Sequence, residues 1–151
     1  MRRTFAVSAL LIAAATGARA ETAATLYSAN CAACHRADAA GVAGQYPPLK
    51  GRIDKIAVTA EGRRYLADVL LYGMVGQIEA NGAAYVGYMP AFNRLSDADI
   101  ASVLTWISSL GGSKPPPAIS AADVTAARAQ PLTAAGVAKQ RQALEAAHPL
   151  P

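Results

Sequence analysis

The sequence predicts an all-α fold in a single domain. Three segments, residues 21–33, 60–72 and 96–110, carry apolar side chains at helical spacing or residues that favour a helix start. No convincing strand precedes the two cysteines, which lie at positions 31 and 34. At 151 residues, the chain is long enough for one domain and too short for two comfortable ones.

The first twenty residues predict a secretory signal peptide. Arg2 and Arg3 form a charged start, residues 5–15 are an apolar run too short to span a bilayer, and Ala18-Arg19-Ala20 is a typical cleavage site. We therefore expect residues 1–20 to be removed on export. No second long apolar segment follows, so we expect a periplasmic mature chain without a transmembrane segment.

The net charge does not indicate a nucleic-acid partner. Three of the 14 basic residues lie in the signal peptide, so the mature chain has 11 basic residues against 10 acidic ones. No basic stripe remains that could neutralise the phosphates of a nucleic acid. We therefore expect no nucleic-acid binding.

Cys31, Cys34 and His35 predict a covalently bound haem. On a helix, positions i, i+3 and i+4 share one face, so two thiols and an imidazole can all address one planar group. C-x-x-C-H is the attachment signature of c-type haem. Cys31 and Cys34 would form thioether bonds to the vinyl groups, and His35 would be the proximal iron ligand.

Three other interpretations of this motif are weaker. A C-x-x-C pair can be a dithiol redox motif, but such pairs follow a strand in a βαβ pattern. A zinc site needs four ligands, and the one further His or Cys is His148 near the C-terminus. A structural disulfide between the two cysteines would leave His35 without a role.

The first helix resembles that of a known family. Ala23, Tyr27 and Cys31 are spaced by four, and a small residue, an aromatic residue and C-x-x-C-H in this order resemble the N-terminal helix of class I c-type cytochromes. The resemblance implies a cytochrome c-like fold over residues 21–112, with three to five helices wrapped around one covalently bound haem c. It also implies crossed first and last helices, with Tyr27 and Trp106 packed at the crossing.

The loop at residues 36–51 is rich in glycine and proline. Residues 41–49 resemble the loop beneath the proximal side of the haem in class I cytochromes. There, a proline carbonyl accepts a hydrogen bond from Nδ1 of the ligand histidine, which fixes the tautomer and makes the ligand more basic. The resemblance implies this role for Pro47 or Pro48, and the sequence does not choose between them.

Residues 60–72 predict a second helix, with Thr59 as a plausible N-cap and Gly73 at its end. Its apolar stripe consists of Tyr65, Leu66, Val69, Leu70 and Leu71. Residues 73–87 are rich in glycine and predict a loop. Within this loop, Asn81-Gly82 predicts a tight turn or a small hairpin.

Met89 is the candidate for the second axial ligand. In class I cytochromes, a Met followed by Pro in a loop before the last helix binds the iron, and Met89-Pro90 resembles this pattern. The resemblance implies His35 and Met89 as the metal ligands, and a soft thioether raises the reduction potential. Met74 competes, but it follows the glycine that ends a helix and suits core packing.

Residues 96–110 predict the last helix of the cytochrome-like part. Ser96 is its N-cap, and Leu95 can pack onto Ile100 as a hydrophobic staple. Gly111-Gly112 ends the helix. The residues expected to be buried are Ile100, Val103, Leu104, Ile107 and Leu110.

Residues 113–118 form a stiff proline-rich linker, and residues 119–151 form a tail with an internal repeat. The repeat puts a hydroxyl residue and then a valine at equivalent helix-start positions. We expect two short helices, about 120–129 and 133–146, neither of which buries much alone. Such a tail lies on the cytochrome domain, docks on a partner or stays poorly ordered.

The resemblance implies one-electron transfer rather than catalysis, because an iron with two protein ligands offers no open coordination site. Pro47-Pro48-Leu49, Asn81-Gly82 and Met89-Pro90 are similar to small cytochrome subunits of periplasmic dehydrogenases. That resemblance implies a periplasmic dehydrogenase as electron donor.

Two alternatives remain. One is a freely diffusing cytochrome c that carries electrons to a terminal oxidase or reductase. Such a carrier is expected to have a charged collar, whereas residues 21–112 hold 7 basic and 8 acidic residues, and the tail favours a subunit. The other alternative is a haem enzyme or sensor with an open sixth site.

Overall fold

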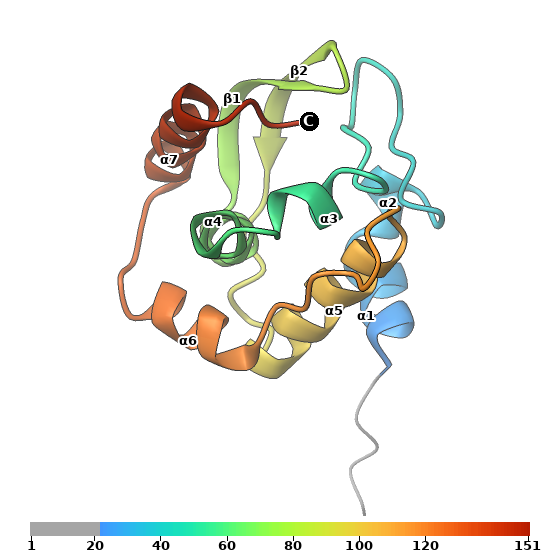
Figure 1. Ribbon diagram of the computed structural model, residues 1–151, viewed down its shortest axis with the longest axis vertical. Coiled ribbons are helices and arrows are strands. Elements are labelled where there is room, and N and C mark those ends of the chain that lie inside the picture. The colour runs from blue at the N-terminus through green and yellow to red at the C-terminus, as the bar shows by residue number, and fades with distance from the viewer. Residues whose placement is uncertain (1–21) are drawn as a thin grey trace, which may run out of the picture.

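A computed structural model describes residues 22–151, so the signal peptide expected at residues 1–20 lies outside the described part of the chain. This part holds seven helices and one two-stranded hairpin (Figure 1). The elements in order are α1 (Ala23–Asn30), α2 (Ala32–His35), α3 (Ile53–Ile56), α4 (Ala60–Tyr72), β1 (Met74–Ala80), β2 (Ala83–Met89), α5 (Asp97–Ser109), α6 (Ala121–Arg128) and α7 (Ala134–Ala147). Between residues 22 and 151, no helix combines the length and the apolar character needed to cross a membrane.

The helix expected at residues 21–33 is divided into α1 and α2. Thr22 caps α1 through its side chain, and the break falls at Cys31, whose φ of −122° lies outside the helical range. The backbone N–H of Cys31 still donates to the carbonyl of Tyr27 at 2.8 Å, so the chain changes direction without losing this bond. The prediction of one continuous helix was therefore wrong, because side-chain spacing carries no sign of a local break.

α4 and α5 confirm the other two predicted helices. The Thr59 hydroxyl accepts a hydrogen bond from the Gly62 N–H at 2.9 Å, and the Ser96 hydroxyl accepts one from the Asp99 N–H at 3.1 Å. Both predicted N-caps are therefore present. The apolar stripes of both helices are buried, with Leu71 and Ile100 fully enclosed, except that Leu110, which was expected to be buried, follows the end of α5 and is partly buried.

β1 and β2 pair antiparallel and form the small hairpin that the sequence offered as one possibility for this region. Asn81 and Gly82 connect the strands with φ of 50° and 75°, as a two-residue turn with two left-handed positions requires. The fold is otherwise helical, so the all-α prediction is confirmed with this one small sheet added.

α1 and α5 pack against each other (Figure 1). The rings of Tyr27 and Trp106 lie there with their centroids 4.8 Å apart and their planes tilted by 41°. Such a tilted aromatic pair contributes about 1 kcal/mol beyond the area that it buries. The packing of Tyr27 against Trp106 was predicted. Tyr27 lies in the core, and the partly buried Trp106 packs against it.

The tail lies on the cytochrome-like part of the chain. α6 packs on α4 and α5, and α7 packs on α4 and β1 (Figure 1). Val124 and Val137, the two valines of the repeat, are fully buried, and Arg128 forms an ion pair with Asp97 at 2.7 Å. Of the three arrangements that the sequence left open, the described residues adopt the one in which the tail completes the core.

Candidate haem site

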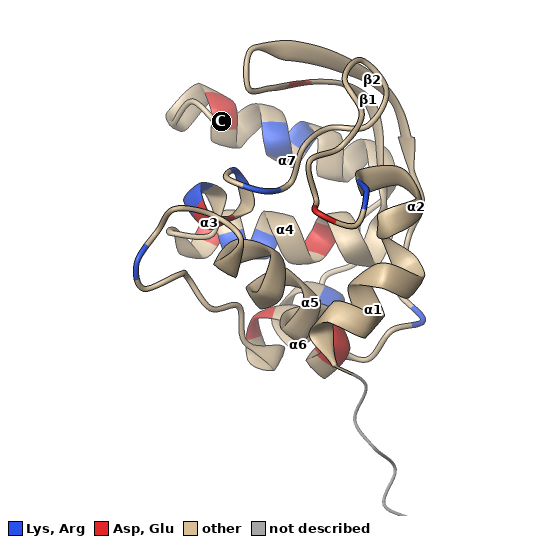
Figure 2. Ribbon diagram, turned by 90° about the vertical axis from the view of Figure 1, so that its right-hand side faces the viewer, with Lys and Arg blue, Asp and Glu red and all other residues tan. Residues whose placement is uncertain are grey.

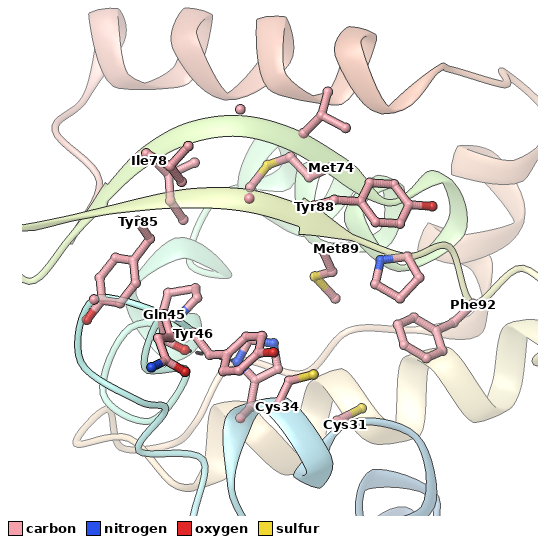
Figure 3. A pocket seen from close by; sticks show the side chains of 18 of the residues that line it. Cys31, Cys34, Gln45, Tyr46, Met74, Ile78, Tyr85, Tyr88, Met89 and Phe92 are labelled. Carbon is pink, nitrogen blue, oxygen red and sulfur yellow. Dashed lines mark hydrogen bonds between the residues drawn. The ribbon is translucent and has the colours of Figure 1, made fainter.

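A cavity of about 620 Å³ lies between α2 and the β1–β2 hairpin (Figure 3). Cys31, Cys34 and His35 line one wall, residues 44–47 line one end, and the hairpin with Met74 and Met89 forms the opposite wall. None of the described residues that line the cavity is Lys, Arg, Asp or Glu. The cavity is therefore a mainly apolar slot with its sulfur and nitrogen donors in two facing walls.

The two cysteines are unlinked and half-buried at the start of α2. Burial and, to a smaller extent, the neighbouring Cys34 raise the pKa of the Cys31 thiol to about 11. Reactive redox cysteines have lowered pKa values, because the thiolate is the attacking species. The raised pKa of Cys31 does not suit a reactive dithiol pair.

His35 is buried and oriented by the loop before α3. Its Nδ1 atom lies 2.9 Å from the carbonyl oxygen of Pro47. Pro48 does not compete for this bond, because its carbonyl accepts a hydrogen bond from Arg52 at 2.9 Å instead. With Nδ1 bonded to a carbonyl, the tautomer carries its proton there and leaves Nε2 as a free lone pair.

The protonation of His35 follows from the same surroundings. Burial lowers the pKa of the imidazole, the bond to Pro47 opposes this effect, and the positive charge of Arg52 lowers the pKa further. The net result is a pKa below the ordinary value. The neutral form, which is the one that binds metals, is therefore favoured.

Met89 and Met74 are paired directly across the hairpin, and both line the cavity. Figure 3 shows the Met89 sulfur pointing from the hairpin toward the wall that holds Cys31 and Cys34. The Met74 sulfur lies 3.4 Å from the Tyr65 hydroxyl, which donates to it. Met89 is the last residue of β2 and not part of a loop, so the expected loop location was wrong although the residue faces the cavity.

The residues around the cavity fit a haem group. Two thiols and one imidazole on a single helical turn face a thioether across apolar walls, which is the donor set for thioether attachment and two axial ligands. His148, the further ligand that a zinc site would have required, does not line the cavity. In the described residues, no three His, Cys, Asp or Glu side chains cluster to hold a metal ion by themselves.

Several lining residues were not identified from the sequence. Tyr46 comes from the proximal loop, and Ile78 and Tyr85 come from the hairpin (Figure 3). Met74 and Ile78, which lie on the same face of β1 with Gly76 between them, were the signal that could have indicated a wall. This signal was weak, because the glycines of the region also favoured a loop.

A cavity with this donor set defines a haem protein of the c type, and comparison with known proteins identifies its family. Residues 20–111 match the cytochrome c family, and the chain belongs to it. The chain is 40% identical over 123 residues to cytochrome c-552 of Thermus thermophilus, in an alignment that covers 77% of this chain and 92% of that protein.

Two further relatives are larger proteins. The chain is 39% identical over 103 residues to the cytochrome c subunit of a quinone alcohol dehydrogenase from Gluconacetobacter polyoxogenes, covering 68% of this chain and 21% of that subunit. It is 32% identical over 123 residues to the corresponding subunit from Gluconobacter oxydans, covering 80% of this chain and 25% of that subunit.

Membership of the family confirms the predicted fold and cofactor. The chain has two cysteines, Cys31 and Cys34, and one haem c is attached covalently through this pair. The role of the protein is electron transfer rather than catalysis.

Proposed function

We propose that the protein transfers single electrons in the periplasm through a haem whose axial ligands are His35 and Met89. One observation carries this proposal: an oriented imidazole and a thioether face the same cavity from opposite walls. The bound haem supplies an iron that alternates between ferric and ferrous states. The chain binds the group, keeps both ligands in position and limits the access of water.

Each ligand is held by a different part of the fold. His35 is fixed by the helical turn of α2 and by the Pro47 carbonyl, which increases its electron donation. Met89 is fixed by its place at the end of β2, opposite Met74. Because a neutral thioether favours the ferrous state, this ligand pair gives a higher potential than a pair of stronger donors.

A periplasmic dehydrogenase is the donor that we propose first, since two relatives are named as cytochrome c subunits of a quinone alcohol dehydrogenase. A freely diffusing carrier is the second candidate, and a specific observation favours it. The tail packs on its own domain, so it no longer argues for a docking arm, and cytochrome c-552 matches the chain over 92% of its length.

The surface at the mouth of the cavity supports contact with an uncharged partner surface. Val86 and Tyr88 of β2 are 70% and 68% exposed, and Tyr46 lies on the other side of the mouth. α1 and α2 contain no Lys, Arg, Asp or Glu, and Glu79 is the one such residue in the hairpin (Figure 2). Apolar contact rather than charge pairing is therefore the expected basis of recognition.

Carbon monoxide binding tests the ligand assignment in the intact protein. We expect the reduced holoprotein to bind carbon monoxide poorly at neutral pH, because both axial positions are filled. Rapid, complete binding would instead indicate a haem enzyme or sensor with an open sixth site. Fractionation of the cells, followed by haem staining after denaturing electrophoresis, tests the compartment, and a stained band confined to the cytoplasm would contradict it.

A surface variant tests the docking face. Val86→Glu should slow electron exchange with the physiological donor at least tenfold, because it puts a charge into an apolar contact. Val58→Glu is the matched control, since Val58 is 64% exposed and does not line the cavity. Equal rates for the two variants would contradict docking at this face.

A further inference from the structure

The β1–β2 hairpin has two edges, and the tail covers one of them. α7 packs on β1, and Figure 1 shows α7 on the β1 side of the hairpin, with β2 on the other side. Arg141 of α7 is 3% exposed, and its Nη2 donates to the Glu79 carbonyl at 2.7 Å. The tail therefore supplies a hydrogen-bond donor to the edge formed by β1.

The register of the hairpin determines which backbone groups point outward. Because residues 81–82 form a two-residue turn, Ala80 and Ala83 beside it are a hydrogen-bonded pair, and such pairs alternate with non-hydrogen-bonded ones. On β1, this alternation gives Glu79 an outward carbonyl, in agreement with its bond from Arg141. On β2, the residues whose N–H and C=O groups point away from β1 are Ala84, Val86 and Tyr88.

The outward backbone groups of β2 have no partner in the described part of the chain. None of the hydrogen bonds formed within residues 22–151 uses the N–H or C=O of Ala84, Val86 or Tyr88. Val86 and Tyr88 are 70% and 68% exposed, so this edge is accessible. A row of unpaired donors and acceptors on an exposed edge is a template for a further strand.

β2 also lacks the features that usually prevent edge pairing. Edge strands are commonly protected by a charged side chain, a proline or a bulge. β2 contains no Lys, Arg, Asp, Glu or Pro, and its register with β1 runs without a bulge from Ala83 to Met89. Valine and tyrosine also favour extended backbone. The edge is therefore suited to pairing with an extended strand.

The haem leaves this edge available. Side chains alternate along β2, so Tyr85 and Met89 share the inner face, whereas Val86 and Tyr88 lie on the opposite face. Tyr85 is 7% exposed, which fits an inner position. A haem beneath the hairpin covers the face of Tyr85 and Met89, and the backbone edge stays at the mouth of the cavity.

We propose that β2 pairs antiparallel with β2 of a second copy of the chain, so that the two hairpins form one continuous sheet. Val86 is the middle residue of β2 and points its backbone outward. A two-fold axis at Val86 therefore pairs this residue with its own copy and pairs Ala84 with Tyr88 of the other copy. Outward N–H groups then meet outward C=O groups along the junction.

The occupant that fits this edge is a second copy, because the strand is complementary to itself in this register. Its lack of charged side chains means that no like charges oppose the contact, and two valines at the axis form a favourable cross-strand pair. β2 also lines the haem cavity, so each copy has its cavity beside the junction. The expected role of the pair is electron exchange between two copies.

A charge exchange at position 86 tests the proposal in the holoprotein. Small interfaces associate weakly, so we expect sedimentation velocity to show the parent changing from monomer to dimer between about 10 µM and about 1 mM. Val86→Lys and Val86→Glu should each weaken the dimer by about tenfold or more, because like charges then face each other across the axis. An equal mixture of the two variants should dimerise again, since opposite charges then face each other.

Val58 provides the matched control. Val58→Lys and Val58→Glu put the same charges at a residue that is 64% exposed and lies outside the hairpin. We expect both to dimerise like the parent, alone and mixed. A parent that stays monomeric at every concentration would overturn the proposal. Val86 variants that dimerise like the parent, or a mixture that stays monomeric, would overturn it as well.

Amide hydrogen exchange in the parent decides the proposal if the Val86 variants do not fold. The amides of residues 84, 86 and 88 should exchange more slowly at about 1 mM than at about 10 µM, because they are protected only in the dimer. The amides of residues 83, 85 and 87 are bonded to β1 at both concentrations and should change much less. Equal behaviour of the two sets would contradict pairing at this edge.

Failure of this proposal is distinguishable from failure of the proposed function. The pairing depends on the backbone of β2 and not on which residue supplies the sixth ligand. A parent that stays monomeric but binds carbon monoxide poorly would reject the dimer and leave the Met89 assignment intact. Electron exchange with the donor is measured separately and does not require a dimer.

Discussion

The Nδ1 atom of His35 and the carbonyl oxygen of Pro47 lie 2.9 Å apart, and this one bond connects the imidazole to a loop that folds back beneath it. The loop is in turn fixed by Gly41, whose N–H donates to the His35 carbonyl at 3.0 Å. The orientation of the imidazole therefore depends on a loop that contributes no ligand of its own.

Gly41→Ala should disturb this bond. A Cβ at position 41 would collide with the Tyr46 and Pro47 carbonyls, and a φ of 72° adds backbone strain. We expect a loss of about 3 kcal/mol in the free energy of unfolding. We also expect a higher reduction potential, because losing the Pro47 bond weakens the electron donation of His35 to the iron. Gly44→Ala is the control, because Gly44 has a φ of 71° with open space around it, and it should cost about 1 kcal/mol with no change in potential. Equal effects would contradict the role given to the Pro47 carbonyl.

Met89→Ala should open the sixth coordination position while the haem stays covalently attached. The reduced variant is expected to bind carbon monoxide readily, and its potential should fall because a ligand that favours ferrous iron is gone. Met74→Ala is the matched control. It should weaken packing around Tyr65 without admitting carbon monoxide, and the reverse pattern would identify Met74 as the ligand.

Val137→Ala tests whether the tail is part of the stable core. Val137 is fully buried between α7 and its neighbours, so losing two methyl groups should lower the free energy of unfolding by about 2 kcal/mol. Denaturant unfolding of the holoprotein provides the measurement. Val58→Ala makes the same change at a residue that is 64% exposed and should have little effect. A neutral Val137→Ala would mean that the tail is not needed for stability.

We expect the free energy of unfolding to fall in acid because of Asp54. Its buried Oδ2 accepts hydrogen bonds from the Gly112 N–H at 3.1 Å, the Ser113 N–H at 3.1 Å and the Ser113 hydroxyl at 2.8 Å. Burial acts to raise the pKa of this carboxyl, but the hydrogen bonds outweigh it and leave the pKa below its ordinary value. Its contribution is therefore complete above the unfolded-state pKa of about 4 and is lost as pH falls below it.

Asp54→Asn should accordingly cost about 2 kcal/mol at pH 7, and this cost should shrink as pH falls below about 4, where the unfolded parent takes up a proton that the folded parent still resists. Thermal unfolding at pH 7 and at several pH values below 4 gives the comparison. Glu61→Gln, which removes an exposed carboxylate, should show neither the cost nor the pH dependence. A constant difference between Asp54→Asn and the parent would show that the charge of Asp54 is not involved.

Local signals explain why much of this structure was predictable. The spacing of Cys31, Cys34 and His35, the N-caps of α4 and α5, and the repeat in the tail all act within a few residues of chain. Each depends on residues that are close together in the sequence, so the sequence pattern predicts it. These features were found in the expected segments, with bounds that differ by one or two residues.

Other features depend on contacts between distant segments, and sequence reasoning missed them. α3 is a single turn whose buried Asp54 is satisfied by Gly112 and Ser113, far along the chain. The choice between Pro47 and Pro48 depends on Arg52, which takes the second carbonyl. The burial of Arg52 and Arg141 was not predicted, because the sequence does not distinguish a buried arginine from an exposed one.

The number of residues between the hairpin turn and Met89 determines which face of the hairpin Met89 occupies. Seven residue pairs follow the Asn81-Gly82 turn, the last of them Met74 with Met89, and alternate residues of a strand face opposite sides. Removing one residue between the turn and Met89 would turn the thioether away from the cavity, whereas removing two residues from each strand would keep it facing inward. The length of this hairpin, counted from the turn, should therefore vary only in steps of two residue pairs.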